Sequence, residues 1–316
     1  MSQRSYAILG TGALGGYYGA RLLHAGCTVR FLLRGDYTHV QAQGMRVESM
    51  HGTQVLPQVE AYRDASEMPP SDVAVVAMKT TQNDALASML PHAVKPDGAV
   101  LVLQNGLEPE RHAAGLVGAE RVIGGLCFLC SNRVGPGHFV QTRFDHIRLG
   151  EYAQRGITPR LNEIAADFCA GDVQTEAVDD LPLTRWKKLV WNIPYNGLSA
   201  VLDADTHELM HNADTEALVT ELMQETARAA RATGGHDIDD AFIETMLGNT
   251  RKMGPYLPSM QIDRRLGRAM EVEAIFGDPV RRAASNGCPV PLIQTLYRQL
   301  RLLDARRLPS AVPTST

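Results

Sequence analysis

A glycine cluster near the start of the chain has the spacing that binds phosphate groups. Gly10, Thr11, Gly12, Ala13, Leu14 and Gly15 follow the apolar run Ser5–Leu9 and open a segment of helical periodicity. In this context Gly10 permits a tight turn, Gly12 lets the backbone approach a pyrophosphate, and Gly15 lets the helix pack on the strand. The helix N-terminus adds free N–H groups and partial positive charge. We therefore predict a dinucleotide site, against the alternative of a glycine-rich turn that binds nothing.

The residue after the second predicted strand indicates which dinucleotide binds. An acidic residue at this point accepts hydrogen bonds from a free ribose 2′-hydroxyl, whereas a guanidinium suits a 2′-phosphate. Here Arg34 follows the strand Thr28–Leu33, so NADP is favoured over NAD. The alternative is that Arg34 is a solvated strand-end residue and Asp36 takes the place of the acid.

Two later strand ends carry polar side chains that could reach the same ligand. Lys79 follows the predicted strand Val73–Met78, and Asn105 follows Ala99–Gln104. Ligands of open parallel sheets lie at the carboxyl ends of the strands, so Lys79 could face a phosphate and Asn105 could hydrogen-bond a ribose or a carboxamide. Each residue alone would be an ordinary surface or turn residue. We assign both, together with Ser131, to the cofactor site.

A second group of polar residues lies in an apolar segment of the second half. Lys188, Asn192 and Asn196 are four residues apart, so on a helix they form one stripe. Buried asparagines need partners, and a lysine among apolar neighbours suits a general acid. A substrate with hydroxyl and carboxylate groups would fit this stripe, although it could also be the polar face of an amphipathic helix. Ser259 and Glu271 follow downstream and mean little by themselves.

The surrounding pattern predicts two domains. Short apolar runs alternate with helical segments over residues 1–180, as in an α/β Rossmann-like domain, with a hairpin over Met45–Val59 and antiparallel strands from Val122. Long helical periodicity over 181–308 predicts an all-α domain, including one helix over Arg264–Asn286. Asp179–Pro182 supplies the boundary, and Pro309–Thr316 is expected to be a frayed tail.

Composition excludes several classes of protein. The 316 residues carry a formal net charge of −4 and are 44% apolar and 21% charged, so nothing attracts nucleic acid or anionic lipid, and disorder is excluded. Five cysteines with no disulfide pattern, no signal peptide and no membrane-spanning run predict a cytoplasmic enzyme. The oligomeric state is left open, with a homodimer through the helical domain as one option.

The order and spacing of these residues resemble the ketopantoate reductases (2-dehydropantoate 2-reductases) over nearly the whole chain. The matching positions are the glycine cluster, Lys79-Thr80, Gln104-Asn105-Gly106, Lys188–Asn192, Asn196, Ser259-Met260, Asp263 and Glu271. The resemblance implies an NADPH-binding Rossmann-like domain, a helical domain like the C-terminal domain of 6-phosphogluconate dehydrogenases, and a substrate cleft between them. It also implies reduction of ketopantoate to pantoate, a step of pantothenate biosynthesis.

The resemblance further implies roles for single residues. Lys188 matches the proton donor of the family, and Glu271 matches a glutamate of the active site. Asn192, Asn196 and Ser259 match residues that bind substrate. Asn105 matches an asparagine that contacts both ligands, and Lys79 matches a lysine that faces the cofactor.

Three positions depart from the family pattern, and all three concern the substrate. Tyr256 and Thr206 stand where the family commonly has asparagines, and Pro258 stands where a second serine is common. A dehydrogenase of the same family acting on a different 2-oxo or 2-hydroxy acid is therefore the alternative function. A non-catalytic NADP sensor is a further alternative, disfavoured because Lys188 and its neighbours are present.

Two short motifs suggest metal chemistry that we do not assign. His207-Glu208-Leu209-Met210-His211 spells the H-E-x-x-H of zinc proteases, but no third-ligand pattern follows it, and we interpret it as an accidental match. Cys127 and Cys130 form a C-x-x-C on a predicted strand, where the two side chains point to opposite faces. No metal site is predicted.

Overall fold

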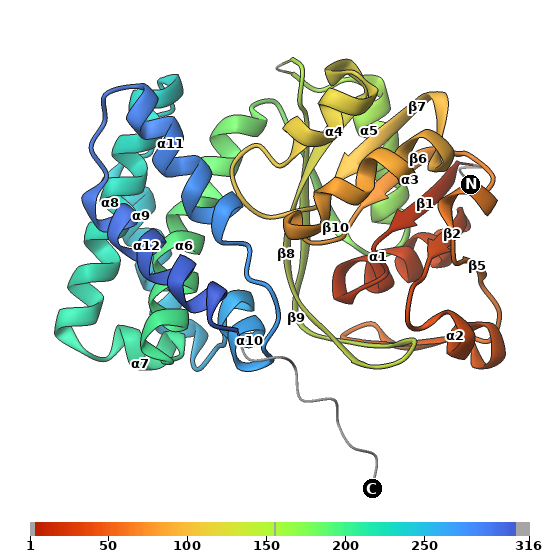
Figure 1. The fold of residues 1–316 in the computed structure, drawn as a ribbon, viewed down its shortest axis with the longest axis horizontal. Coiled ribbons are helices and arrows are strands. Elements are labelled where there is room, and N and C mark those ends of the chain that lie inside the picture. Colours follow the sequence, from red (N-terminus) through yellow and green to blue (C-terminus); the bar gives the residue numbers. More distant parts are fainter. Residues whose placement is uncertain (1–3, 155, 308–316) are drawn as a thin grey trace, which may run out of the picture. The chain divides into compact units, whose positions relative to one another are not determined.

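The computed structural model describes residues 4–154 and 156–307, which divide into two compact units (Figure 1). The first unit comprises the residues up to Gln104 and Pro109–Leu181. The second comprises Asn105–Glu108 and the chain from Pro182 onward. The predicted tail Pro309–Thr316 lies outside the described residues.

The first unit is built on one sheet with the strand order β4, β3, β9, β8, β7, β6, β1, β2, β5, and β10 pairs with β9. The strands are β1 (Ser5–Leu9), β2 (Thr28–Leu32), β3 (Met45–Ser49), β4 (Gly52–Leu56), β5 (Glu60–Tyr62), β6 (Ser71–Val76), β7 (Val94–Val102), β8 (Val122–Gly135), β9 (His138–Glu151) and β10 (Gln174–Val178). From β5 across to β8 the pairing is parallel, and β8 with β9 and β3 with β4 form antiparallel pairs. The mixed α/β class predicted from the sequence is confirmed.

Helices cover both faces of this sheet. The helices of the unit are α1 (Ala13–His24), α2 (Tyr37–Gln43), α3 (Leu86–Ala93), α4 (Glu110–Val117) and α5 (Pro159–Ala170). Alternate residues of β1 enter different cores: Tyr6 and Ile8 join the core that includes α1 and α5, whereas Ala7 and Leu9 join the core that includes α3 and α4. Burial on both faces explains why β1 is an unbroken apolar run.

The strand order reverses at β1. The chain passes from β1 to β2 and β5 on one side of it, and later adds β6 and β7 on the other side. In open parallel sheets, the carboxyl ends of the strands at such a switch point form the ligand-binding edge. The turn after β1 begins at Gly10, the chain after β2 reaches Arg34, and the chain after β6 reaches Lys79. The topology therefore brings these three positions to one edge of the sheet.

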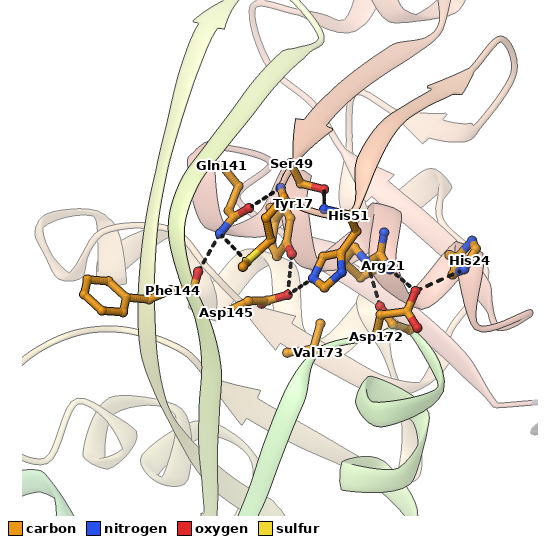
Figure 2. Close-up of polar contacts among 12 residues, drawn as sticks. Tyr17, Arg21, His24, Ser49, His51, Gln141, Phe144, Asp145, Asp172 and Val173 are labelled. Atoms are coloured by element: carbon orange, nitrogen blue, oxygen red, sulfur yellow. Dashed lines mark hydrogen bonds and ion pairs between the residues drawn. The ribbon is translucent and has the colours of Figure 1, made fainter.

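A buried carboxylate holds α1 against the long β8–β9 hairpin (Figure 2). The Tyr17 hydroxyl donates to Asp145 Oδ2 at 2.6 Å, and His51 Nε2 lies 2.8 Å from the same oxygen. Burial, and the hydrogen bond to Asp145, raise the pKa of Tyr17 well above its usual value. Tyr17 therefore stays a hydrogen-bond donor, and α1, which carries the glycine cluster at its start, is tied to β9.

The second unit consists of helices around one apolar core. They are α6 (Leu181–Leu202), α7 (Thr206–Met210), α8 (Ala213–Gly234), α9 (Asp240–Met253), α10 (Ser259–Arg265), a π-helical turn η4 (Glu273–Gly277), α11 (Asp278–Ser285) and α12 (Pro291–Ala305). This confirms the predicted all-α class. In the described part of the chain, no helix combines the length and the apolar composition needed to cross a membrane.

The single helix predicted over Arg264–Asn286 is wrong. α10 ends at Arg265, Gly267 adopts a φ of +63°, and regular helix resumes only near the π-helical turn. The backbone N–H of Arg268 turns back to the carbonyl of Asp263 at 2.8 Å. This break places Glu271 in the segment before the turn rather than within a helix. Ser259 is the first residue of α10.

Asp72 joins the beginnings of three strands, and this predicts an acid-dependent loss of stability. Its carboxylate accepts the backbone N–H and the hydroxyl of Ser5 at 2.8 and 2.7 Å and the ammonium of Lys95 at 2.6 Å. Partial burial alone would raise the pKa of Asp72, but the bonds from Lys95 and Ser5 lower it to about 2. Because the unfolded value is about 3.9, the stabilisation is complete above about pH 4 and is lost as the pH falls from there through about 2.

We expect Asp72→Asn to lower the free energy of unfolding by about 1 kcal/mol near neutral pH, since the pair with Lys95 is partly exposed. The difference from the unsubstituted protein should shrink at about pH 3. Both tryptophans, Trp186 and Trp191, lie in the second unit, so urea unfolding should be followed by circular dichroism. A difference that stays constant with pH would contradict this assignment.

Candidate functional site

The glycine cluster forms a backbone surface that side chains would obstruct. Gly10 has a φ of +98°, and a Cβ there would lie 2.5 Å from the backbone nitrogen of Met78; a Cβ on Gly15 would lie 2.3 Å from the Gly10 carbonyl oxygen. At Gly12, in contrast, a Cβ would have no atom within 4 Å. Two glycines are therefore required by packing, and the third leaves open space above the turn.

The open turn leads directly into α1. Gly12 occupies the N-cap position in an extended conformation, and it supplies no side-chain cap. The first N–H groups of a helix have no partners within the helix, so those of the first turn can donate to an anion. Ser131, from β8, donates to the carbonyl of Ala13 at 3.1 Å, and the Thr11 hydroxyl donates to the carbonyl of Leu32 at 3.0 Å. These two hydroxyl groups tie the turn and the start of α1 to β2 and β8.

Arg34 and Lys79 meet through a third residue. The guanidinium of Arg34 donates to Gln82 Oε1 at 2.7 Å, and the backbone N–H of Gln82 donates to the carbonyl of Lys79 at 2.9 Å. Arg34 is exposed and Lys79 is half-buried. The structure thus brings the guanidinium of Arg34 and the backbone of Lys79 to one place at the strand ends.

Asp36, the alternative to Arg34, is already engaged. It is buried, its Oδ1 accepts from Arg133 at 2.5 Å, and its Oδ2 accepts the backbone N–H of Gly137 at 3.1 Å. Both carboxylate oxygens therefore serve to fasten the β8–β9 turn. An exposed arginine, rather than an available carboxylate, stands where a ribose 2′ substituent would be recognised.

Together these residues fit a dinucleotide with a 2′-phosphate. Gly12 leaves room for phosphate groups, the start of α1 offers N–H donors, and Arg34 and Lys79 supply positive charge. The fit rests on the open space at Gly12 and on the engagement of Asp36.

The second unit joins Lys188, Asn105 and Glu271 in one chain of hydrogen bonds. Lys188, on α6, donates from Nζ to Asn105 Oδ1 at 3.0 Å. The Asn105 amide nitrogen donates to Glu271 Oε2 at 3.3 Å. Lys188 is half-buried and Glu271 is 7% exposed. The carboxylate therefore sets the orientation of the Asn105 amide, which in turn presents its oxygen to the ammonium.

Anchoring of the backbone explains how residues so far apart in sequence meet. The N–H of Leu107 donates to the carbonyl of Ala274 at 2.9 Å, so the short segment Asn105–Glu108 is bound to the π-helical turn η4. π-helical turns are rare and occur frequently at functional sites. Glu271 lies two residues before this turn, and its carbonyl accepts the N–H of Ile275 at 3.1 Å.

The two asparagines of the predicted stripe lie one and two turns further along α6. Asn196 is 2% exposed, and its Oδ1 accepts from the Ser259 hydroxyl at 3.3 Å and from the Met260 N–H at 3.1 Å. Asn192 is 7% exposed, yet no described residue forms a hydrogen bond with its side chain. The Asn192 amide is not among the polar groups that are closed off from solvent without a partner, so a ligand could reach it.

The H-E-x-x-H motif has another use. The Glu208 carboxylate accepts the backbone N–H of Asp205, and Asp205 accepts the N–H of Glu208, which makes a capping box at the start of α7. His211 Nδ1 lies 2.8 Å from the carbonyl of His207, and the two imidazole rings pack 3.7 Å apart. Within the described ranges, no three metal-binding side chains gather at one point.

Sequence reasoning missed two residues that support these groups. Gln82 orients Arg34, and its place after Lys79, at the same strand end, was the available signal. Arg133, on β8, donates to the Asp36 carboxylate, and nothing in the local sequence indicates that contact.

Comparison with known proteins places this geometry in context. The model of the family described as "Ketopantoate reductase PanE/ApbA" matches residues 6–154, and that of its C-terminal domain matches residues 180–304. A protein of Nostoc sp. named 2-dehydropantoate 2-reductase is 53% identical over 97% of each chain.

Two solved structures are also similar. The 2-dehydropantoate 2-reductase of Geobacter metallireducens is 41% identical, with a TM-score of 0.92 over 94% of this chain and 99% of that one. The 2-dehydropantoate 2-reductase of Methylococcus capsulatus is 31% identical, with a TM-score of 0.88 over 97% and 99% of the two chains.

Proposed function

Because this chain belongs to the ketopantoate reductase family, we propose that it reduces ketopantoate to pantoate with NADPH, using Lys188 as the proton donor. The observation that carries the assignment of Lys188 is its placement: the ammonium is held by Asn105 at 3.0 Å and lies on the same face of α6 as two buried asparagines. A cation beside amide groups suits a ketone that becomes an alkoxide.

The side chains of the second unit would divide the work as follows. NADPH, when bound, supplies a hydride to the ketone carbon. The Lys188 ammonium donates a hydrogen bond to the ketone oxygen, stabilises the negative charge that develops there, and transfers its proton to complete the hydroxyl group. Solvent then reprotonates the neutral amine. Asn105, fixed by Glu271, holds the ammonium in position.

The buried amides would bind the rest of the substrate. Ser259 and Met260 occupy the oxygen of Asn196, which leaves its amide nitrogen to donate to a carboxylate or hydroxyl oxygen. Asn192 offers both an acceptor and donors. Ketopantoate carries a carboxylate, a ketone and a terminal hydroxyl group, so these groups match its polar atoms in kind.

The cofactor residues support the choice of NADPH. Arg34 and Lys79 provide positive charge where a 2′-phosphate would lie, while the Gly10–Gly15 turn and the start of α1 would hold the pyrophosphate. Ser131 and Thr11 act on the turn through its backbone, so we propose that they shape the cofactor site rather than bind phosphate themselves.

The test of this function is NADPH oxidation by the purified protein with ketopantoate, run beside a panel of other 2-oxo acids. We expect ketopantoate to be reduced with the highest kcat/KM and pantoate to accumulate in proportion to NADPH consumed. If another 2-oxo acid is reduced with a higher kcat/KM than ketopantoate, the proposed substrate is wrong but the proposed type of reaction stands. NADPH binding with no turnover of any acid would indicate a sensor and overturn the proposal.

We also propose that the protein works in a reducing compartment such as the cytoplasm. All five cysteines are free, and Cys169 is exposed, a state that an oxidising compartment would not preserve. Dimerisation through the helical unit stays a prediction.

A further inference from the structure

A row of aromatic residues runs beside the polar stripe of α6. Trp191 and Tyr195 each precede an asparagine of the stripe by one residue, and their rings lie 4.8 Å apart. Tyr195 is fully buried and Trp191 is half-buried. The Trp191 indole N–H donates to the Thr250 hydroxyl at 3.0 Å, which fixes the plane of the ring. Successive residues of a helix point about 100° apart, so this fixed aromatic surface lies on the face of α6 that flanks the stripe.

Tyr256 extends this aromatic surface from a different part of the chain. Its ring lies 6.1 Å from that of Trp191 at an angle of 51°, within the range of favourable aromatic pairs. Tyr256 is three residues before Ser259, which donates to Asn196. Three residues of extended chain span at most about 11 Å, so the tyrosine lies near the Asn196–Ser259 pair. Tyr256 is half-buried, so the residue is not closed off within the helical core.

Thr206 holds the loop that carries Tyr256. Its backbone N–H donates to the carbonyl of Tyr256 at 3.0 Å, and its hydroxyl donates to the carbonyl of Gly254 at 3.1 Å. Thr206 is fully buried. Two hydrogen bonds from one buried residue fix the backbone on either side of Pro255, so the position of the Tyr256 ring is set by the fold.

We propose that Tyr256, supported by Trp191, is a specificity-determining residue that packs against the C3 substituents of the 2-oxo acid. This rests on the proposed function. The carboxylate, ketone and hydroxyl groups of the substrate would form their polar contacts with Lys188, Asn192, Asn196 and Ser259. The two methyl groups on C3 of ketopantoate then need an apolar partner, and a half-exposed aromatic ring beside the stripe supplies one. The preferred substrate class is therefore 2-oxo acids that are branched at C3.

The experiment compares two acids that differ only in those methyl groups: ketopantoate and 4-hydroxy-2-oxobutanoate. The unsubstituted protein should prefer ketopantoate. Tyr256→Ala should lower kcat/KM for ketopantoate by tenfold or more, mainly through KM, because each carbon in an apolar contact contributes about tenfold or more to discrimination. The kcat/KM for the unbranched acid should change by no more than about twofold. Tyr256→Phe, which keeps the ring, should retain the preference for ketopantoate over the unbranched acid.

A second variant separates this role from support of the loop. Thr206→Val removes the hydrogen bond to Gly254 and should lower kcat/KM for both acids alike. Thr206→Ser keeps the hydroxyl group and should retain both values. If Tyr256→Ala also lowers kcat/KM for both acids alike, Tyr256 supports the loop and the proposal is overturned. An unchanged kcat/KM for ketopantoate overturns it as well. NADPH binding and circular dichroism identify a variant that fails to fold, in which case Tyr256→Leu replaces it in the same comparison.

Failure of the proposed function gives a different pattern. If the unsubstituted protein ignores ketopantoate but reduces other 2-oxo acids, the ratio between branched and unbranched acids still tests Tyr256. If it reduces none of them, the function and this proposal both fall.

Discussion

Replacing Lys188 by alanine should lower kcat by about 10²–10⁴-fold while NADPH binds with nearly unchanged affinity. The substitution removes the proton donor and the positive charge that stabilises the developing alkoxide. It leaves the glycine turn, Arg34 and Lys79 intact, because these lie in the other unit. Steady-state NADPH oxidation measures the first effect, and a fluorescence titration of NADPH measures the second.

Lys187 provides a matched control for this variant. It lies next to Lys188 on α6 and carries the same charge, but its ammonium lies 5.5 Å from the centre of the Phe242 ring on α9. Lys187→Ala should change kcat by less than about threefold, since a cation–π contact of this kind acts mainly on stability. Partial rescue of Lys188→Ala by added primary amines would support proton donation, which a structural role would not produce. Full activity of Lys188→Ala would remove Lys188 from the mechanism.

The first unit could be predicted closely because its signals are local. The apolar run of β1, the glycines that follow it and the start of α1 lie within about twenty residues, and the strand-turn-helix order allows few arrangements. The hairpin formed by β3 and β4 was also visible from its alternating pattern, and its turn is formed by Met50 and His51. Helix α2 escaped prediction because its seven residues have a single buried position, Val40.

The second unit was predicted less well because its site depends on contacts between distant residues. Asn105 meets Lys188 across 83 positions and Glu271 across 166. The break after α10 depends on the positive φ of Gly267 and on the π-helical turn, whereas the apolar spacing over Arg264–Asn286 reads as one helix. Spacing along α6 revealed the stripe, since it is a property of one helix, but not the residues that face it.

The charged residues proposed to contact a ligand are easier to select from the sequence than the residues that orient them. Arg34 could be identified from its position after β2 alone. The engagement of Asp36 by Arg133 and Gly137 could not, because it requires the β8–β9 turn to return to the end of β2. That contact bears on the choice between the two cofactors, and it leads to a quantitative expectation for Arg34.

Arg34→Ala should weaken NADPH binding by about 10–100-fold and leave NADH binding nearly unchanged. Hydrogen bonds between a guanidinium and a phosphate contribute about 1.5–3 kcal/mol each, and NADH has no 2′-phosphate to lose them. The preference of NADPH over NADH should therefore collapse in the variant. Because exposed charges are screened by salt, the difference between the two cofactors in the unsubstituted protein should also narrow as ionic strength rises.

Arg63→Ala is the matched control, because Arg63 is an exposed arginine of the same unit that packs on the Tyr37 ring and donates to Thr38 in α2. It should leave both affinities unchanged, which separates a local phosphate contact from the general charge of the unit. Fluorescence titrations of NADPH and NADH against the two variants give the four affinities. Equal losses of NADPH and NADH in Arg34→Ala would mean that Arg34 only supports Gln82 and the strand end. In that case the positive charge at the 2′-phosphate would have to come from Lys79, and Lys79→Ala should then show the selective loss instead.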